Sequence, residues 1–305
     1  MNTLDRYVRV YECLHNRKGI SPFLLSPIRR IVRFLANRFI PKYFEEEQLI
    51  LSDRQSEIIV SLTSFPARIS SVHLVIQCML RQTILPRKII LWLSKEQFES
   101  ITLPDSLTSL ESDIFNIRFV DGDIKSHKKY FYVLSEFPNM DVLLVDDDLY
   151  YPTDMIEKMQ KASEERPNTI ICRFCSIMKY NSETILPYND WWSEVVSESD
   201  DQNLFFGSGG GTLLKKSLLY KDVLDINLAT SLTPLADDIW LNAMVNLKGT
   251  KKFKIYCGLI LQIEINNNQK LSKINVSEDK NTEQMNMLIN YYKTTNGLMP
   301  FPNKK

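Results

Sequence analysis

The sequence predicts an α/β fold with a mostly parallel central sheet flanked by helices. Short apolar runs typical of buried strands alternate with segments of helical character between residues 57 and 148. This alternation is typical of βαβ units, in which helices cover a parallel sheet. With 44% hydrophobic and 24% charged residues, the 305-residue chain has the composition and length of a globular protein with a full core.

Four strands and two helices are expected in the first half of the chain. The strands lie in the apolar runs of EIIVSLTSFP, PRKIILWLS, NIRFVDGD and MDVLLVDDD, and the helices run from about Ile69 to Arg81 and from about Ser126. Polar or Pro-containing turns follow three of the strands, at residues 63–68, 121–129 and 146–148. Because ligands bind at the carboxyl ends of parallel strands, we expect these turns to share one rim of the sheet.

The second half of the chain changes in character. It contains the strand-like runs TIICRFCSIM and KFKIYCGLILQIEI, a glycine cluster between them, and a helix that starts at ADDIWLNAM. A last helix is expected at about 282–293, before a tail that contains Pro and Lys. We therefore expect a basic helical extension at 1–50, the α/β domain at 51–265, and a C-terminal helix and tail at 266–305.

Bulk charge and cysteine usage exclude several classes of protein. Lys plus Arg and Asp plus Glu both number 37, so no global field attracts nucleic acid, and we expect no nucleic-acid partner. No apolar run reaches the ~18 residues of a membrane span, and no signal peptide opens the chain. We expect a cytoplasmic protein with reduced thiols. Cys172 and Cys175 would face opposite sides of a strand, which disfavours a shared zinc ion.

The N-terminal extension breaks the overall charge balance. Residues 13–44 contain seven basic residues and no acidic one. Pro27 suits the first position of a helix. Such a basic amphipathic helix would either lie on an anionic membrane or pack on the domain with a solvated basic face, and its pattern serves both. The apolar residues at helical spacing are Ile28, Ile31, Val32, Leu35 and Phe39.

Three adjacent carboxylates follow the strand in MDVLLVDDDLYYP. Asp146, Asp147 and Asp148 come directly after a buried apolar run, where like charges are costly without a counter-charge. Hard divalent cations, Mn²⁺ or Mg²⁺, take one or two carboxylates and complete their shell with phosphate oxygens. The pattern favours a metal site over a solvated acidic loop, with Asp146 and Asp148 on one face and Asp147 on the other.

A lysine-rich turn opens the second helix. Lys125, Lys128 and Lys129 follow Asp123, and cations at a helix start oppose the helix dipole. If a diphosphate binds there, the helix N-terminus and the lysines act together. The alternative is a basic surface turn.

A second acidic pair, Asp237 and Asp238, opens the helix at ADDIWLNAM. One of the two carboxylates would cap the helix. The other is surplus to capping and suits a general base beside an acceptor hydroxyl.

The glycine cluster and a tryptophan pair are candidate substrate-binding elements. Gly209 and Gly210 belong to a cluster of four glycines in five residues, where backbone approaches a neighbour closely or takes positive φ. Trp191 and Trp192 would stack on a sugar, although core packing is the commoner fate of at least one member of such a pair.

Six of these segments, in this order, resemble a group of bacterial glycosyltransferases of the GT-A fold that are related to family 2 and act in polysaccharide and capsule biosynthesis. The segments are VSLTSFPARI, QTILPRKIILWLS, DIKSHKKYFYVL, LLVDDDLYYP, GSGGGTLL and ADDIWLNAM. The resemblance spans about residues 57–250 and does not cover the first fifty residues or the last forty.

The resemblance implies a nucleotide-sugar donor whose diphosphate carries Mn²⁺ or Mg²⁺ held by Asp146 and Asp148. It implies that Asp237 or Asp238 is the base of an inverting reaction, without settling which. The donor would be a UDP-sugar and the acceptor a glycan or lipid-linked saccharide, at the inner face of the cytoplasmic membrane. A retaining transferase or a non-catalytic nucleotide-binding module are the alternatives. The donor-binding residues expected are Thr63, Ser64, Phe65, Arg68, Asp123, Lys125, Lys128, Lys129, Asp146 and Asp147.

Overall fold

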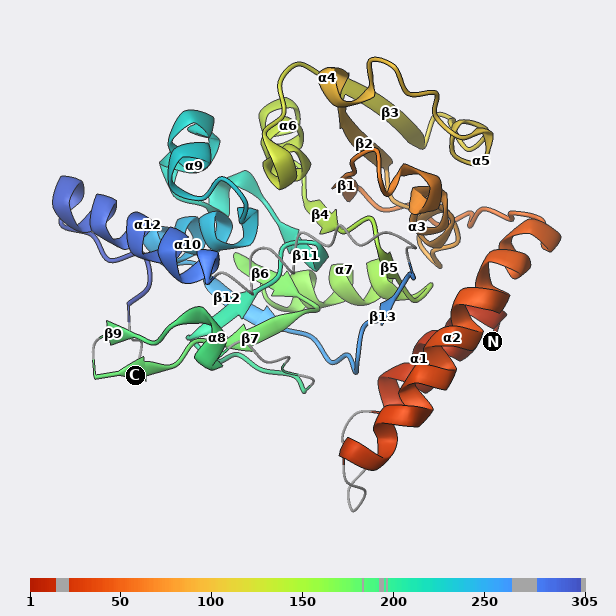
Figure 1. Ribbon diagram of the computed structural model, residues 1–305, viewed down its shortest axis with the longest axis horizontal. Helices are drawn as coiled ribbons and strands as arrows, with labels where there is room; N and C mark the ends of the chain where they lie inside the picture. Colours follow the sequence, from red (N-terminus) through yellow and green to blue (C-terminus); the bar gives the residue numbers. More distant parts are fainter. Residues whose placement is uncertain (15–21, 183, 192–194, 196, 265–278, 303–305) are drawn as a thin grey trace.

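The structure, a computed structural model, describes residues 1–14, 22–182, 184–191, 195, 197–264 and 279–302. Its centre is a seven-stranded sheet in the order β12-β6-β11-β4-β1-β2-β3 (Figure 1). β11 runs antiparallel to both of its neighbours and the other strands are parallel, which confirms the predicted α/β class with a mostly parallel sheet. The strands are β1 (Ile59–Thr63), β2 (Lys88–Ser94), β3 (Phe115–Val120), β4 (Val142–Val145), β6 (Thr169–Cys172), β11 (Gly210–Leu214) and β12 (Lys251–Lys254).

Helices cover both faces of the sheet. Leu143 and Val145 of β4 face one apolar core, whereas Val142 and Leu144 face the other, as the two-residue period of a strand requires. The first core contains residues of α3 (Val72–Leu80) and α7 (Met155–Glu165), and the second those of α6 (Lys128–Glu136), α10 (Asp237–Lys248) and α12 (Lys280–Asn296). A strand buried on both sides explains why MDVLLV reads as a continuous apolar run.

Shorter elements connect these layers or lie at their edges. Within the described ranges, three further pairs of strands lie outside the main sheet, β7 with β10, β5 with β13 and β8 with β9. The run TIICRFCSIM, expected as one strand, divides after Cys172, and β7 leaves the sheet to pair with β10. The bounds are η1 (Ile69–Ser71), α4 (Lys95–Phe98), α5 (Asp105–Thr108), η2 (Lys125–His127), β5 (Leu149–Tyr150), β7 (Cys175–Ile177), β8 (Tyr180–Asn181), β9 (Thr184–Ile185), α8 (Tyr188–Trp191), β10 (Leu204–Phe206), η3 (Lys216–Leu218), η4 (Lys221–Leu224), α9 (Ile226–Leu232) and β13 (Leu261–Gln262).

The N-terminal segment forms two helices that lie side by side, α1 (Thr3–Cys13) and α2 (Pro22–Glu46) (Figure 1). The expectation that Pro27 starts the helix was wrong: α2 starts at Pro22, and Pro27 lies inside it. Asp5 of α1 accepts hydrogen bonds from the backbone nitrogen (2.9 Å) and Oγ1 (2.6 Å) of Thr153, which attach α1 to the domain.

The two sides of α2 differ in what they contact. One side is buried and contributes Ala36 and Ile40 to the main core. The opposite side of α2 is exposed to solvent and carries the apolar residues Leu24, Ile28, Ile31, Phe34 and Phe39.

None of the helices in the described ranges is both long and apolar enough to cross a bilayer.

Candidate functional site

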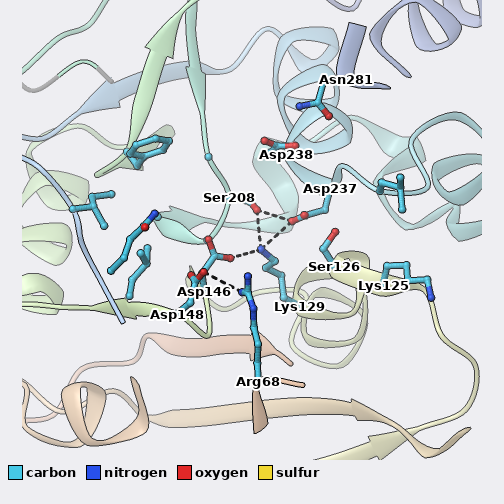
Figure 2. A pocket seen from close by; sticks show the side chains of 18 of the residues that line it. Arg68, Lys125, Ser126, Lys129, Asp146, Asp148, Ser208, Asp237, Asp238 and Asn281 are labelled. Carbon is cyan, nitrogen blue, oxygen red and sulfur yellow. Dashed lines mark hydrogen bonds and ion pairs between the residues drawn. The ribbon is translucent and has the colours of Figure 1, made fainter. Parts of the chain in front are cut away.

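A cavity of about 450 Å³ opens at the carboxyl ends of the parallel strands (Figure 2). Residues from all three turns expected at this rim line it: Arg68 after β1, Lys125 and Lys129 after β3, and Asp146 and Asp148 after β4. The glycine cluster and the start of α10 complete the wall. Figure 2 shows Lys129 pointing between Asp146 and Asp237, whereas Lys125 extends away from them.

The three adjacent aspartates separate into two roles. Asp147 is buried and accepts hydrogen bonds from Ser64 Oγ and Arg68 Nη1, each at 2.6 Å. Asp146 and Asp148 instead line the cavity. Arg68 Nη1 also lies 3.1 Å from Asp148 Oδ2, and its guanidinium stacks over the ring of Phe65. The Asp147–Arg68 pair therefore fixes the turn, while the other two carboxylates face the ligand space.

The aspartate turn carries more negative charge than its neighbours neutralise. Burial and the charges of Asp147 and Asp146 raise the pKa of Asp148 to about 7. Two carboxylates on one cavity wall fit a hard divalent cation, which takes oxygen ligands. In the described parts of the chain no group of three acidic, histidine or cysteine side chains lies close enough together to hold a metal ion.

The glycine loop packs directly on the aspartate turn. A Cβ atom at Gly209 would lie 1.6 Å from Asp146 Oδ1, so any side chain there would displace the Asp146 carboxylate. The Gly209 carbonyl accepts hydrogen bonds from the Asp146 backbone nitrogen (2.8 Å) and the Tyr151 hydroxyl (2.5 Å). At Gly210 a Cβ would lie 2.3 Å from Cβ of Phe174. The glycines are thus required for close packing that places Asp146.

Lys129 lies buried between the two acidic groups. Its Nζ is 2.8 Å from Asp146 Oδ1 and 3.4 Å from Asp237 Oδ2, and it donates to Ser208 Oγ at 3.1 Å. Burial alone would lower the pKa of Lys129, but Asp146 and Asp237 together raise it well above its ordinary value. The lysine stays charged and links the aspartate turn to the start of α10.

The other two lysines of the turn differ from each other. Lys128 is buried and its Nζ lies 2.5 Å from Asp123 Oδ1, and it does not line the cavity. Lys125 lines the cavity, with its side chain half exposed, and also pairs with Asp123. Of the three expected diphosphate contacts, Lys125 and Lys129 therefore reach the site.

The two aspartates that open α10 have opposite electrostatic environments. Asp237 Oδ2 accepts a hydrogen bond from Ser208 Oγ at 2.6 Å and faces Lys129. Burial would raise the pKa of Asp237, but Lys129 and its other partners lower it below its ordinary value. Burial and the charge of Asp237 raise the pKa of Asp238 to about 7. Near neutral pH, Asp237 is ionised while Asp238 is poised to exchange a proton.

Some expected site residues lie elsewhere. Trp191 is 1% exposed and packs on Tyr188 and Phe205, and Trp192 lies outside the described residues. Thr63 Oγ1 donates to the carbonyl of Trp92, and neither Thr63 nor Phe65 lines the cavity. The polar lining residues that the sequence predictions did not include are Tyr188, Ser208 and Asn281, together with Ser126 and Gln262. Of the first three, only Ser208 carried a signal in the sequence, because it lies inside the glycine cluster.

No family model and no curated protein matches the chain. The solved structures that match it include a mannosyltransferase from Pyrobaculum calidifontis in complex with GDP-Man and Mn²⁺, at 11% identity over 90% of this chain and 72% of that one. They also include the 4-diphosphocytidyl-2C-methyl-D-erythritol synthase from Anaerococcus prevotii, at 17% identity over 72% of this chain and 95% of that one. The TM-score is 0.42 in both cases, which assigns the chain to neither family.

Proposed function

We propose that the chain is a metal-dependent glycosyltransferase of the GT-A type that moves a sugar from a UDP-sugar to a hydroxyl of a glycan or lipid-linked saccharide. One observation carries the proposal. A single cavity holds two carboxylates suited to a cation, Asp146 and Asp148, and a separate carboxylate of raised pKa, Asp238. The ordered sequence motifs support the same choice. The proposed catalytic domain is 51–265, with 1–50 and 266–305 as its extensions.

The donor half of the proposed site is the wall formed by β1, β4 and the start of α6. Asp146 and Asp148 would hold Mn²⁺ or Mg²⁺, which when bound neutralises charge on the leaving diphosphate. Lys125 at the rim is free of the tight burial of Lys129 and would contact the diphosphate directly. Lys129 and Gly209 keep Asp146 in position. The 63–68 loop would meet the nucleotide.

Asp238 is the proposed general base. A base works best when its pKa lies near the working pH, because it must be ionised and still accept a proton. Asp238 satisfies this with a pKa of about 7, whereas Lys129 and Ser208 hold Asp237 ionised and weakly basic. In the proposed reaction Asp238 removes the proton of the acceptor hydroxyl as that oxygen attacks the anomeric carbon, and the configuration inverts.

Donor hydrolysis tests the proposal. A panel of nucleotide sugars is incubated with the protein and Mn²⁺, and release of the nucleoside diphosphate is measured with and without chelator. We expect one donor to be cleaved, with loss of activity in chelator and recovery on adding Mn²⁺ or Mg²⁺. Asp238→Asn separates the alternatives, because a retaining enzyme keeps transfer without this base. Absence of turnover with every donor, despite nucleotide binding, would instead indicate a binding module.

The exposed side of α2 is the proposed membrane contact. Its apolar side chains include Phe34 and Ile31, 64% and 58% exposed, and exposed basic residues Arg30, Arg38 and Lys42 accompany them. A helix with this composition can insert its apolar side chains shallowly into a bilayer while its basic side chains are attracted to anionic lipid. We propose that this face of α2 holds the enzyme at the inner surface of the cytoplasmic membrane, where lipid-linked acceptors lie.

A further inference from the structure

One wall of the cavity has no part in the proposed donor chemistry. Tyr188 of α8, Leu235 in the turn before α10, and Asn281 of α12 line it. Figure 2 shows Asn281 on the side of Asp238, away from Arg68. Tyr188 and Asp238 line the same cavity, and burial, followed by the charge of Asp238, raises the pKa of the Tyr188 hydroxyl. This wall therefore adjoins the proposed base, not the aspartate turn.

Asn281 lines this wall and carries an unsatisfied polar atom. The residue is 7% exposed, and its buried Oδ1 has no hydrogen-bond partner in the described part of the chain. Buried polar atoms in native proteins are hydrogen-bonded in the large majority of cases, because an unmade bond is costly. A ligand that donates a hydrogen bond would satisfy this atom.

The position of Asn281 is fixed by its neighbours in the first turn of α12. Thr282 Oγ1 accepts a hydrogen bond from the backbone nitrogen of Tyr188 at 2.8 Å. Gln284 Oε1 accepts one from the backbone nitrogen of Leu235 at 2.9 Å. The same helical turn is thus fastened to both other members of the wall. Asn281 is held in place without using its own amide oxygen.

We propose that Asn281 is a specificity-determining residue of the acceptor site. Its Oδ1 accepts a hydrogen bond from a hydroxyl of a neutral sugar, beside the hydroxyl that Asp238 deprotonates. An amide oxygen only accepts, so it selects a hydroxyl or amine donor. The adjacent Asp237 and Asp238 carboxylates disfavour an acidic sugar at this wall. This inference rests on the proposed function for its reaction, although the hydroxyl-binding site itself does not require turnover.

A set of methyl glycosides and their monodeoxy analogues tests the inference. The variant is Asn281→Ala, and the matched control is Asn286→Ala, the same change on the exposed side of the same helix. In wild type, removing one particular hydroxyl should lower kcat/KM at least roughly tenfold, because a site built to bind a hydroxyl rejects the analogue without it. Asn281→Ala should accept the parent and that analogue equally, with a raised KM for the parent glycoside and unchanged affinity for UDP.

Two further measurements separate the possible failures. Binding of the glycosides, followed by saturation-transfer NMR in the presence of UDP, tests the site even if no donor is turned over. If no donor is turned over but Asn281→Ala loses glycoside binding and Asn286→Ala keeps it, the hydroxyl-binding site is supported and the proposed reaction is refuted. Equal deoxy penalties in wild type and Asn281→Ala would overturn the inference, as would a wild type that binds none of the glycosides. Because Oδ1 has no partner to lose, the melting temperature of Asn281→Ala should not fall below that of wild type.

Discussion

Replacing each of the two adjacent aspartates of α10 by Asn should change the stability of the fold in opposite directions. Asp238→Asn removes a charge that the folded state disfavours, since its pKa there is raised to about 7 from the ordinary 3.8. Asp237→Asn removes a charge that Lys129 and Ser208 stabilise, since the pKa of Asp237 is lowered. Both variants keep the size and shape of the side chain.

The size of the stability change expected for Asp238→Asn follows from the linkage between proton binding and folding. A rise of about three pKa units corresponds to at most about 4 kcal/mol of destabilisation in the ionised form, at ~1.4 kcal/mol per unit. The folded state binds the proton more tightly, so wild-type stability is reduced as pH rises from about 4 to about 7 and stays reduced above that. The advantage of Asp238→Asn should therefore grow by up to roughly 3 kcal/mol between about pH 5 and pH 8.

Asp237→Asn should show the reverse. The ionised carboxylate stabilises the folded state above the ordinary pKa of an aspartate, and this contribution is lost as pH falls through the lowered pKa. At neutral pH we expect the variant to lose about 1–3 kcal/mol, because the buried Lys129 loses one of its two acidic partners. At a pH below the lowered pKa of Asp237, the difference in stability between Asp237→Asn and wild type should disappear.

Denaturant unfolding at several pH values measures both effects, with transfer assayed on the same samples. We expect Asp238→Asn to lower kcat at least roughly a hundredfold, the typical contribution of a general base. The wild-type rate should rise with pH through about 7, as Asp238 ionises. If Asp238→Asn instead loses stability as Asp237→Asn does, or retains the wild-type rate, the assignment of the base is wrong.

Three further predictions concern the donor site and the membrane. Asp146→Ala should abolish transfer, and chelator should do the same to wild type until Mn²⁺ or Mg²⁺ is restored; full activity in chelator would refute the metal site. Lys125→Ala should weaken binding of UDP roughly three- to tenfold by calorimetry without a change in melting temperature. Equal affinity would show that this half-exposed lysine only pairs with Asp123 and does not contact the nucleotide. Vesicles with anionic lipid should sediment wild type at low salt but not a variant carrying Arg30→Glu and Arg38→Glu, and supernatant protein in both cases would leave α2 as a helix packed on the domain.

The sheet and the rim of the site follow from local patterns in the sequence. Buried strands of parallel sheets are read as apolar runs, and their polar ends meet at one edge, so Asp146 and Lys129 could be placed without coordinates. The direction of β11 could not be predicted, because GGTLL reads the same in a parallel or an antiparallel strand. Neither could the end of β6 after Cys172, where the chain turns to let β7 pair outside the sheet.

The residue-level errors share one cause, which is that side-chain direction is set by tertiary packing. Lys128 and Lys129 are adjacent in the sequence, yet one turns to Asp123 and the other to Asp146. Trp191 is in the core because Tyr188 and Phe205 surround it. Asn281 carries no local signal at all, since its placement depends on hydrogen bonds to segments far away in the chain.

The two hydrogen bonds that join α12 to Tyr188 and Leu235 have a consequence for how the site could change during evolution. The donor wall is built from one contiguous stretch, 59–148, whereas the acceptor wall is assembled from three short segments that α12 ties together. A substitution in the first turn of α12 therefore alters what is recognised beside Asp238 without disturbing the aspartate turn. In the proposed enzyme, acceptor choice would therefore be separable from the donor site, and exchanging that helical turn would be a route to new linkages.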